Sequence, residues 1–230
     1  MFFKVDEQIF QRVNDYCVGV ITAGKLTQPD RLDFLSGYYD AAFLDASQRL
    51  KDVDVKTMPG IEKYRKALTA LGVNPNKFPC SIEALFRRIQ KGNQINSISP
   101  LVDLGLAISI KYTFPVGLHA IDSFPGDMEV RFSNDDDVFD EGAHLTGQSE
   151  PVYVTGNSVR TRNWLWRQTE AGRSTTSDSK SLLFLIDGFL SDRESIIKAR
   201  DELELFLKNL FSAETKAGFV CAETPSFEIA

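Results

Sequence analysis

Apolar residues in the first half of the chain recur mostly at the three- to four-residue spacing of an amphipathic helix. This spacing predicts helices over residues 29–50, 62–71, 81–92 and 100–112. Gly72 and Gly92 are typical stop residues, and Ser81 is the expected N-cap of its helix. Two apolar runs, residues 2–5 and 16–23, instead predict strands, and residues 51–60 are expected to form a polar linker.

The pattern changes after Pro115. Short segments rich in Val, Ile, Phe and Trp alternate with Gly, Asn and Asp, which predicts strands and tight turns. These segments are GLHAI, DMEVRF, PVYVTG and SVRTRNWLW. The continuous apolar run 181–187 predicts a strand buried on both faces, and Ser191 is expected to begin a last helix. The tail after Gly218 is expected to be extended or frayed, and the order of elements indicates an α+β fold.

Composition adds limits on location and partners. The 230 residues are 43% hydrophobic, include 17 Phe and carry a net charge of −6, which argues against general adhesion to nucleic acid or anionic membranes. Three widely spaced cysteines fit a reducing compartment and offer no zinc motif. The N-terminus lacks the pattern of a signal peptide, and no apolar run approaches the ~18 residues of a membrane span. We therefore expect a cytoplasmic protein.

The segment from Ser97 to Phe124 contains the most informative motif. A Val-Asp pair at 102–103 precedes a predicted helix, and Phe-Pro-Val-Gly-Leu-His-Ala-Ile-Asp follows it at 114–122. This order resembles the editing module of the phenylalanyl-tRNA synthetase beta chain, its B3/B4 (third and fourth) domains, and their free-standing relatives. There the pattern is Val-Asp, a helix, then Gly-x-Pro-Leu-His-Ala-Phe-Asp. Residues 57–92 and the Arg-Asn-Trp-Leu-Trp-Arg segment at 162–167 resemble the family as well, so the likeness spans roughly residues 57–188.

The resemblance implies a three-layer α+β fold containing a β-sandwich, here a single domain over residues 1–230 with a C-terminal helix at 191–211 covering it. It also implies a pocket that takes the tRNA 3′ end carrying a wrong amino acid. The leading hypothesis is hydrolysis of that aminoacyl ester in trans, without metal or cofactor, and with neither DNA nor a membrane as partner. The alternative is a non-catalytic module that binds tRNA, a nucleotide or an amino acid. The oligomeric state stays open.

Two residues match the family's site positions. His119 corresponds to the pocket histidine, so it would donate a hydrogen bond to the substrate or orient water near the ester; its alternative is a structural histidine at the turn after Pro115. Glu170 falls where the family has a Gly-Gly-Glu turn whose glutamate recognises the wrong amino acid; its alternative is a solvated loop carboxylate. Gln168 and Thr169 replace the two glycines, so amino-acid specificity does not carry over.

A cluster of arginine and tryptophan follows, and it is the candidate surface for tRNA. In a strand, alternate residues share one face, so Arg160, Arg162, Trp164 and Trp166 are expected to lie together. Arginine suits phosphate and tryptophan can stack on a base. The alternative is a half-buried ribbon whose arginines pair with acids such as Glu150. The remaining candidates for this surface are Arg167, Arg173 and Thr176.

Other polar motifs favour structural roles. Asp103 and Asp122 are expected to cap a helix or turn, and Asp122 is also a candidate to fix the tautomer of His119. The acidic run 135–137 indicates a hairpin turn because it lacks the Gly and distal Glu of a calcium loop. His144 has no partner motif, and no Ser-His-Asp or Cys-His arrangement is evident.

Overall fold

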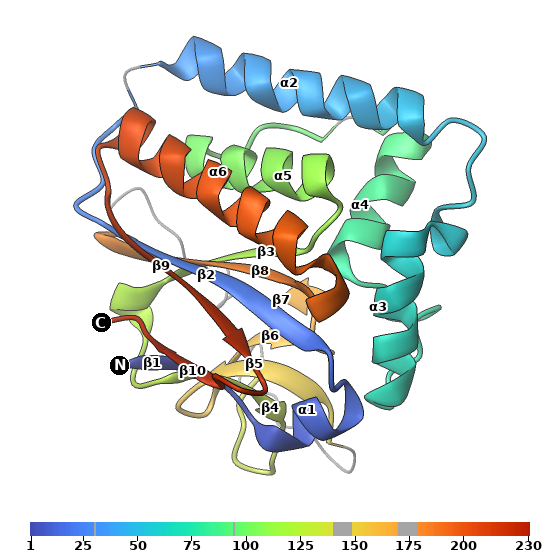
Figure 1. Cartoon of the computed structure of the whole chain (residues 1–230), viewed down its shortest axis with the longest axis vertical. Coiled ribbons are helices and arrows are strands. Elements are labelled where there is room, and N and C mark those ends of the chain that lie inside the picture. The colour runs from blue at the N-terminus through green and yellow to red at the C-terminus, as the bar shows by residue number, and fades with distance from the viewer. Residues whose placement is uncertain (30, 94, 140–148, 170–178) are drawn as a thin grey trace.

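Two β-sheets packed face to face form the lower half of the molecule, and helices cover the upper sheet (Figure 1). The structure is a computed structural model and describes residues 1–29, 31–93, 95–139, 149–169 and 179–230. Buried aromatic residues fill the space between the sheets. Tyr16 of one sheet and Tyr153 of the other meet there, with 2.8 Å between their hydroxyl oxygens. The α+β fold with a β-sandwich, expected from the family resemblance, is confirmed in this arrangement.

The upper sheet is antiparallel and has the strand order β3-β8-β2-β9. Its strands are β2 (Tyr16–Gly24), β3 (Val116–Ala120), β8 (Ser181–Phe189) and β9 (Glu214–Cys221). The central strands β2 and β8 are apolar on both faces because one face meets the lower sheet and the other meets helices. The prediction of a doubly buried strand in this part of the chain is confirmed.

The lower sheet has the order β10-β1-β4-β5-β6-β7, and in it only β1 and β4 are paired in parallel among the described strands. Its strands are β1 (Phe2–Val5), β4 (Met128–Phe132), β5 (Pro151–Thr155), β6 (Ser158–Arg162), β7 (Arg167–Gln168) and β10 (Ser226–Glu228). Both ends of the chain therefore enter this sheet. The segment after Gly218, expected to be extended or frayed, is extended and paired with β1 and β2.

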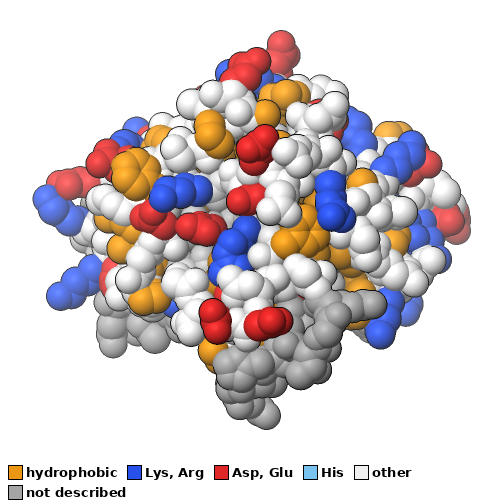
Figure 2. All heavy atoms as spheres, turned by 90° about the horizontal axis from the view of Figure 1, so that it is seen from below, with side chains coloured by type: hydrophobic (Ala, Val, Ile, Leu, Met, Phe, Trp, Pro, Cys, Tyr) orange, Lys and Arg blue, Asp and Glu red, His pale blue; other side chains and the backbone are white. Residues whose placement is uncertain are grey.

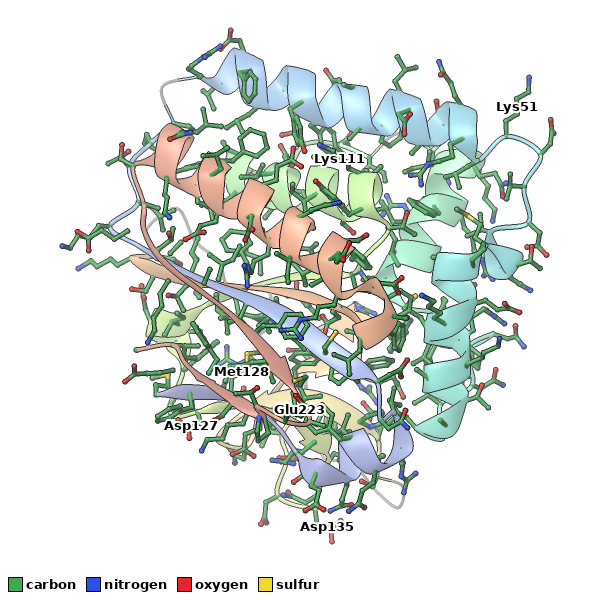
Figure 3. All side chains as sticks on the ribbon, in the orientation of Figure 1. Lys51, Lys111, Asp127, Met128, Asp135 and Glu223 are labelled. Carbon is green, nitrogen blue, oxygen red and sulfur yellow. The ribbon has the colours of Figure 1, made fainter. Side chains whose placement is uncertain are left out.

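Helices cover the upper sheet and one side of the molecule, except for the first helix, which lies beside β4 of the lower sheet. They are α1 (Glu7–Arg12), α2 (Leu32–Arg49), α3 (Pro59–Ala70), α4 (Ser81–Gln90), α5 (Pro100–Tyr112) and α6 (Arg193–Phe211). Helices α5 and α6 pack on the sheet, and α2 lies over α5 (Figure 1). Lys111 of α5 joins these helices: it pairs with Glu202 of α6 at 2.7 Å and lies over the ring of Tyr38 in α2 (Figure 3).

Helix boundaries follow the sequence pattern with two differences. Cys80, not Ser81, is the N-cap of α4, and no side-chain hydrogen bond caps it. Ser81 is the first residue of the helix, and its amide donates to the Leu165 carbonyl. The linker at 51–60 contains a short 3₁₀ turn, Val55–Thr57, and Pro59 already begins α3 as its first residue. Among the described residues, no helix is both long and apolar enough to cross a membrane.

Candidate functional site

A cavity of about 170 Å³ lies where the edge of the upper sheet meets the lower sheet. Strand β3 contributes Gly117 and His119, β8 contributes Asp187, and β5 contributes Tyr153. Strand β7 completes the lining with Arg167 and Gln168, next to Trp166. The Gln168 amide also donates to the Leu118 carbonyl at 3.1 Å, which holds β7 against β3 across the two sheets.

Two other hollows in the described part of the chain lack buried ionisable groups in their lining. A cavity of about 140 Å³ beside Pro100 and Phe211 has no ionisable lining residue among those described. A groove of about 750 Å³ near Lys4 and Glu7 is lined by ionisable groups, but none of them is buried. The cavity between the sheets is different because it combines a buried histidine with a buried carboxylate.

His119 lies in the wall of this cavity with 2% of its surface exposed. Its ring stacks on Tyr153, with 6.3 Å between centroids and 15° between planes. Burial lowers the pKa of His119 from 6.5 to about 3, and the positive charge of Arg160 acts in the same direction. The imidazole is therefore neutral at pH 7, which fits the expected hydrogen-bonding function better than one in proton transfer.

The surroundings of the ring favour one tautomer of His119. Its Nδ1 is buried and finds no hydrogen-bond partner among the described residues. A buried N–H without an acceptor is costly, so we assign the proton to Nε2 and leave Nδ1 with its lone pair. Nε2 lies on the side of Gly117, another cavity residue, whose added Cβ would be only 3.3 Å away. His119 thus presents an N–H donor beside the cavity.

Asp187 is a site residue that the sequence analysis did not single out. It is 2% exposed, and both the Tyr16 hydroxyl, at 2.5 Å, and the Tyr153 hydroxyl donate to its Oδ1. Burial raises the pKa of Asp187 to about 6, while the two hydroxyls act to lower it. The available signal was one acid within the continuous apolar run SLLFLID, since a carboxylate in such a strand needs a special partner.

The arginine-tryptophan segment does not form one strand face as predicted. Strand β6 ends at Arg162, and Asn163 and Trp164 have positive φ values of 46° and 60°, which turn the chain. Trp164 points into the core, where it is fully buried against Tyr16. It offers no face for stacking on a base, and the expectation of a shared face is wrong because this turn breaks the alternation.

Arg160 and Arg162 both have protein partners. Arg160 is 5% exposed and donates to the Thr155 hydroxyl and the Ser123 carbonyl. Arg162 pairs with Glu150 through two bonds of 2.9 and 3.0 Å, as the alternative of a half-buried ribbon predicted. The contacts with Thr155 and Glu150 join β6 to the two ends of β5, and the contact with Ser123 joins β6 to the turn after β3.

The second half of the segment does reach the cavity. Trp166 is half-buried and lines the cavity. Its ring makes an edge-to-face contact with Phe78, with 4.8 Å between the ring centroids. Arg167 is exposed, so it lies where the cavity opens to solvent, and Thr169 is buried with its hydroxyl donated to the Val159 carbonyl at 2.7 Å. Glu170, Arg173 and Thr176 lie outside the described residues, as does His144.

The remaining acidic residues have structural partners. Asp103 accepts bonds from the Ser97 hydroxyl and the Ile98 amide before α5, and Asp122 accepts from the Lys180 amide at 2.6 Å. Asp122 therefore does not orient His119. In the acidic turn after β4, Asp137 is buried and pairs with Arg131 at 2.7 Å, while Asp135 projects at the end of the molecule (Figure 3). Within the described ranges no group of acidic, His or Cys residues has the arrangement of a metal site.

Charges on the described surface are mixed. Figure 2 looks at the end formed by the lower sheet, and in its coloured part basic and acidic side chains alternate without a large basic area. This pattern agrees with the net charge of −6. A ligand of this face would therefore be held at a local site and not along an extended track of phosphates.

Comparison of the sequence with known proteins gives a family match over the part of the chain that forms the cavity. The family profile "B3/4 domain" matches residues 63–208, which include β3, β5, β6, β7 and β8, the strands that line the cavity. No curated protein matches the sequence. Among solved structures, an N-terminal fragment of the phenylalanyl-tRNA synthetase beta-subunit from Pyrococcus horikoshii is similar at 11% identity, with a TM-score of 0.47. The alignment covers 93% of this chain and 49% of that chain, so the chain spans about half of the fragment's length.

Proposed function

Because the chain belongs to the B3/4 domain family, with the profile matching more than half of its length, we propose that it hydrolyses the ester of mischarged aminoacyl-tRNA in trans. The observation that carries the proposal is the cavity between the sheets. It combines a neutral His119 with an N–H donor and a buried carboxylate, at the position of the motif that resembles the synthetase editing module. The aminoacyl end would enter this cavity, and the tRNA body would stay outside.

The chemistry asks little of the protein. Water attacks the ester carbonyl, the bond between the carbonyl carbon and the ribose 3′ oxygen breaks, and the proton of the water passes to that oxygen. The products are the free amino acid and a tRNA with its 3′ hydroxyl restored. Such a reaction is accelerated by holding the ester and water in place and by donors aimed at the developing oxyanion.

His119 supplies one such donor in the proposal. With its pKa at about 3 it stays neutral across the physiological range, so its Nε2–H donates to the carbonyl oxygen or fixes the attacking water. Glu170 is the second predicted site residue and lies outside the described residues. Its participation stays part of the proposal.

The experiment is a deacylation assay with a panel of mischarged tRNAs. Wild-type protein is expected to release at least one amino acid, and His119→Gln to slow release by about 10²-fold or more, as for loss of one oxyanion donor. Thermal melts of the variant check its fold. If no ester is lost faster with the protein than without it, the proposal is wrong.

One observation favours a second candidate, a binding module without turnover. In the described part of the chain, no hydroxyl or thiol forms a nucleophile–base pair with His119, and the low pKa of this residue makes it a weak proton acceptor. A module of this kind would bind the 3′ end of tRNA without releasing the amino acid. Binding that weakens with salt, in the absence of hydrolysis, would favour it over the enzyme.

A further inference from the structure

Asp187 is a buried acid with a free oxygen beside the cavity. The hydroxyls of Tyr16 and Tyr153 both donate to its Oδ1, and Oδ2 accepts no hydrogen bond from any described residue. No lysine or arginine of the described chain forms an ion pair with it. Buried carboxylates are normally paired with a cation, so this one lacks its usual partner.

The tyrosines hold this carboxylate in place. Tyr16 and Tyr153 are themselves buried and come from different sheets, and the Tyr64 hydroxyl donates to the Asp187 backbone carbonyl at 2.7 Å. On the far side of Asp187, Gly188 lets α6 pack closely, because an added Cβ would come within 2.6 Å of Ile196. Asp187 is thus fixed in position before any ligand arrives, which reduces the ordering cost of binding.

The charges along the cavity have an order. Among the described lining residues, Asp187 is the acid and is buried, Arg167 is the base and is exposed, and His119 is neutral. A ligand that fits this order has a cationic group that goes in and an anionic part that stays near the opening. A 3′-aminoacyl nucleotide has this distribution, with an α-ammonium on the amino acid and phosphates on the nucleic acid.

We propose that Asp187 binds the α-ammonium group of the aminoacyl ligand through its Oδ2. The inference rests on the proposed function and adds a requirement to it: the ligand must have a free, charged amino group. N-blocked aminoacyl esters and peptidyl esters, which lack this charge, are then rejected because they would leave the buried carboxylate without a cation.

The test uses a stable ligand so that binding and turnover are separated. The probes are 3′-(aminoacylamido)-3′-deoxyadenosines with alanine, phenylalanine or tyrosine, each with a free amine and in an N-acetylated form. Titration calorimetry with the full chain gives the dissociation constants. Wild-type protein is expected to bind at least one free-amine probe about 10- to 100-fold more tightly than its N-acetyl counterpart, the effect of one charge-assisted hydrogen bond.

Variants assign this preference to Asp187. Asp187→Asn keeps the size and an acceptor for both tyrosines, and it is expected to bind the two forms within about twofold of each other. Asp45→Asn is the matched control, since Asp45 is exposed on the outer helix α2 and its loss changes the net charge by the same amount. This control is expected to keep the full preference for the free amine.

The results separate the two proposals. Wild-type protein that binds neither form, or both equally, overturns the role of Asp187, and so does an Asp187→Asn variant that keeps the preference. The wild-type comparison needs no variant, so it decides even if Asp187→Asn fails to fold. Hydrolysis of free-amine and N-acetylated aminoacyl-tRNA at equal rates supports the proposed function and overturns this inference. Preferential binding of free-amine probes without hydrolysis of any ester supports the role of Asp187 in binding and overturns the proposed hydrolysis.

Discussion

The hydroxyl of Tyr153 in the lower sheet donates a hydrogen bond to the carboxylate of Asp187 in the upper sheet. Both residues are 2% exposed, and both line the cavity that contains His119. A single contact therefore links the packing of the two sheets to the arrangement of the candidate site. Tyr16 adds a second donor to the same carboxylate oxygen from within the upper sheet.

Replacing Tyr153 with Phe is expected to lower the free energy of unfolding by about 1–3 kcal/mol, because a hydrogen bond to a buried charged group is lost. The change should also raise the pKa of Asp187 above about 6, since this hydroxyl is one of the two that lower it. Urea unfolding at pH 7 measures the first effect. Tyr112→Phe, which removes a bond to the less buried Glu202, is the control, and an equal loss in both variants would contradict the special role of Tyr153.

Stability should depend on pH through two opposing groups in the cavity. The pKa of His119 is lowered to about 3, so acid favours the unfolded state, and stability is lost as pH falls from about 6.5 towards 3. The pKa of Asp187 is raised to about 6, so the folded state binds its proton first, and stability is lost as pH rises from about 4 to 6. Between pH 4 and 6 the two effects oppose each other.

Asp187→Asn removes one side of this balance. The variant should lose stability relative to wild type as pH falls from 6 to 4, by up to about 1.4 kcal/mol for each pH unit. His119→Gln should change in the opposite direction, becoming more stable relative to wild type over the same range. Urea unfolding at pH 4, 5, 6 and 7 tests both. Parallel curves for all three proteins would mean that neither group titrates as described.

Gly117→Ala tests whether Nε2 of His119 is the working edge of the ring. The added Cβ would lie 3.3 Å from Nε2, close enough to displace the ring or block its N–H. We expect deacylation or ligand binding to fall by about tenfold or more, with a small effect on thermal stability. Gly126→Ala is the matched control, because its added Cβ would meet no atom within 4 Å. Unchanged activity in Gly117→Ala would exclude this edge.

Arg167 and Arg162 should differ in their effect on tRNA binding, although the sequence pattern makes both candidates for the same surface. Arg167→Ala is expected to weaken tRNA binding and to reduce the salt slope of log K by about 1, since an exposed cation at the opening would contact one phosphate. Arg162→Ala should leave that slope unchanged and cost up to about 1 kcal/mol of stability, because Arg162 pairs with Glu150. Filter binding at several salt concentrations distinguishes them. Equal slopes in both variants would contradict the assignment.

Local periodicity was enough to predict most of the helices and strands. Elements such as α3, α5 and β8 can be predicted from the sequence because burial of one face or of both faces determines where their apolar residues fall. The predicted N-cap of α4 was wrong by one residue. Ser81 has the chemistry of an N-cap but is the first residue of the helix, and its amide donates to the carbonyl of Leu165, which is distant in sequence.

Residue types at short spacings are enough to predict the α+β class, the family motif and the candidate His119. The surroundings of that histidine, in contrast, depend on how distant segments of the chain pack together. Tyr16 and Asp187 are 171 residues apart along the chain, and the turn at Trp164 sends one tryptophan into the core and the next to the cavity. Periodicity reports that a residue is buried but not which residue it meets, because cross-sheet contacts depend on the register of strands far apart in sequence.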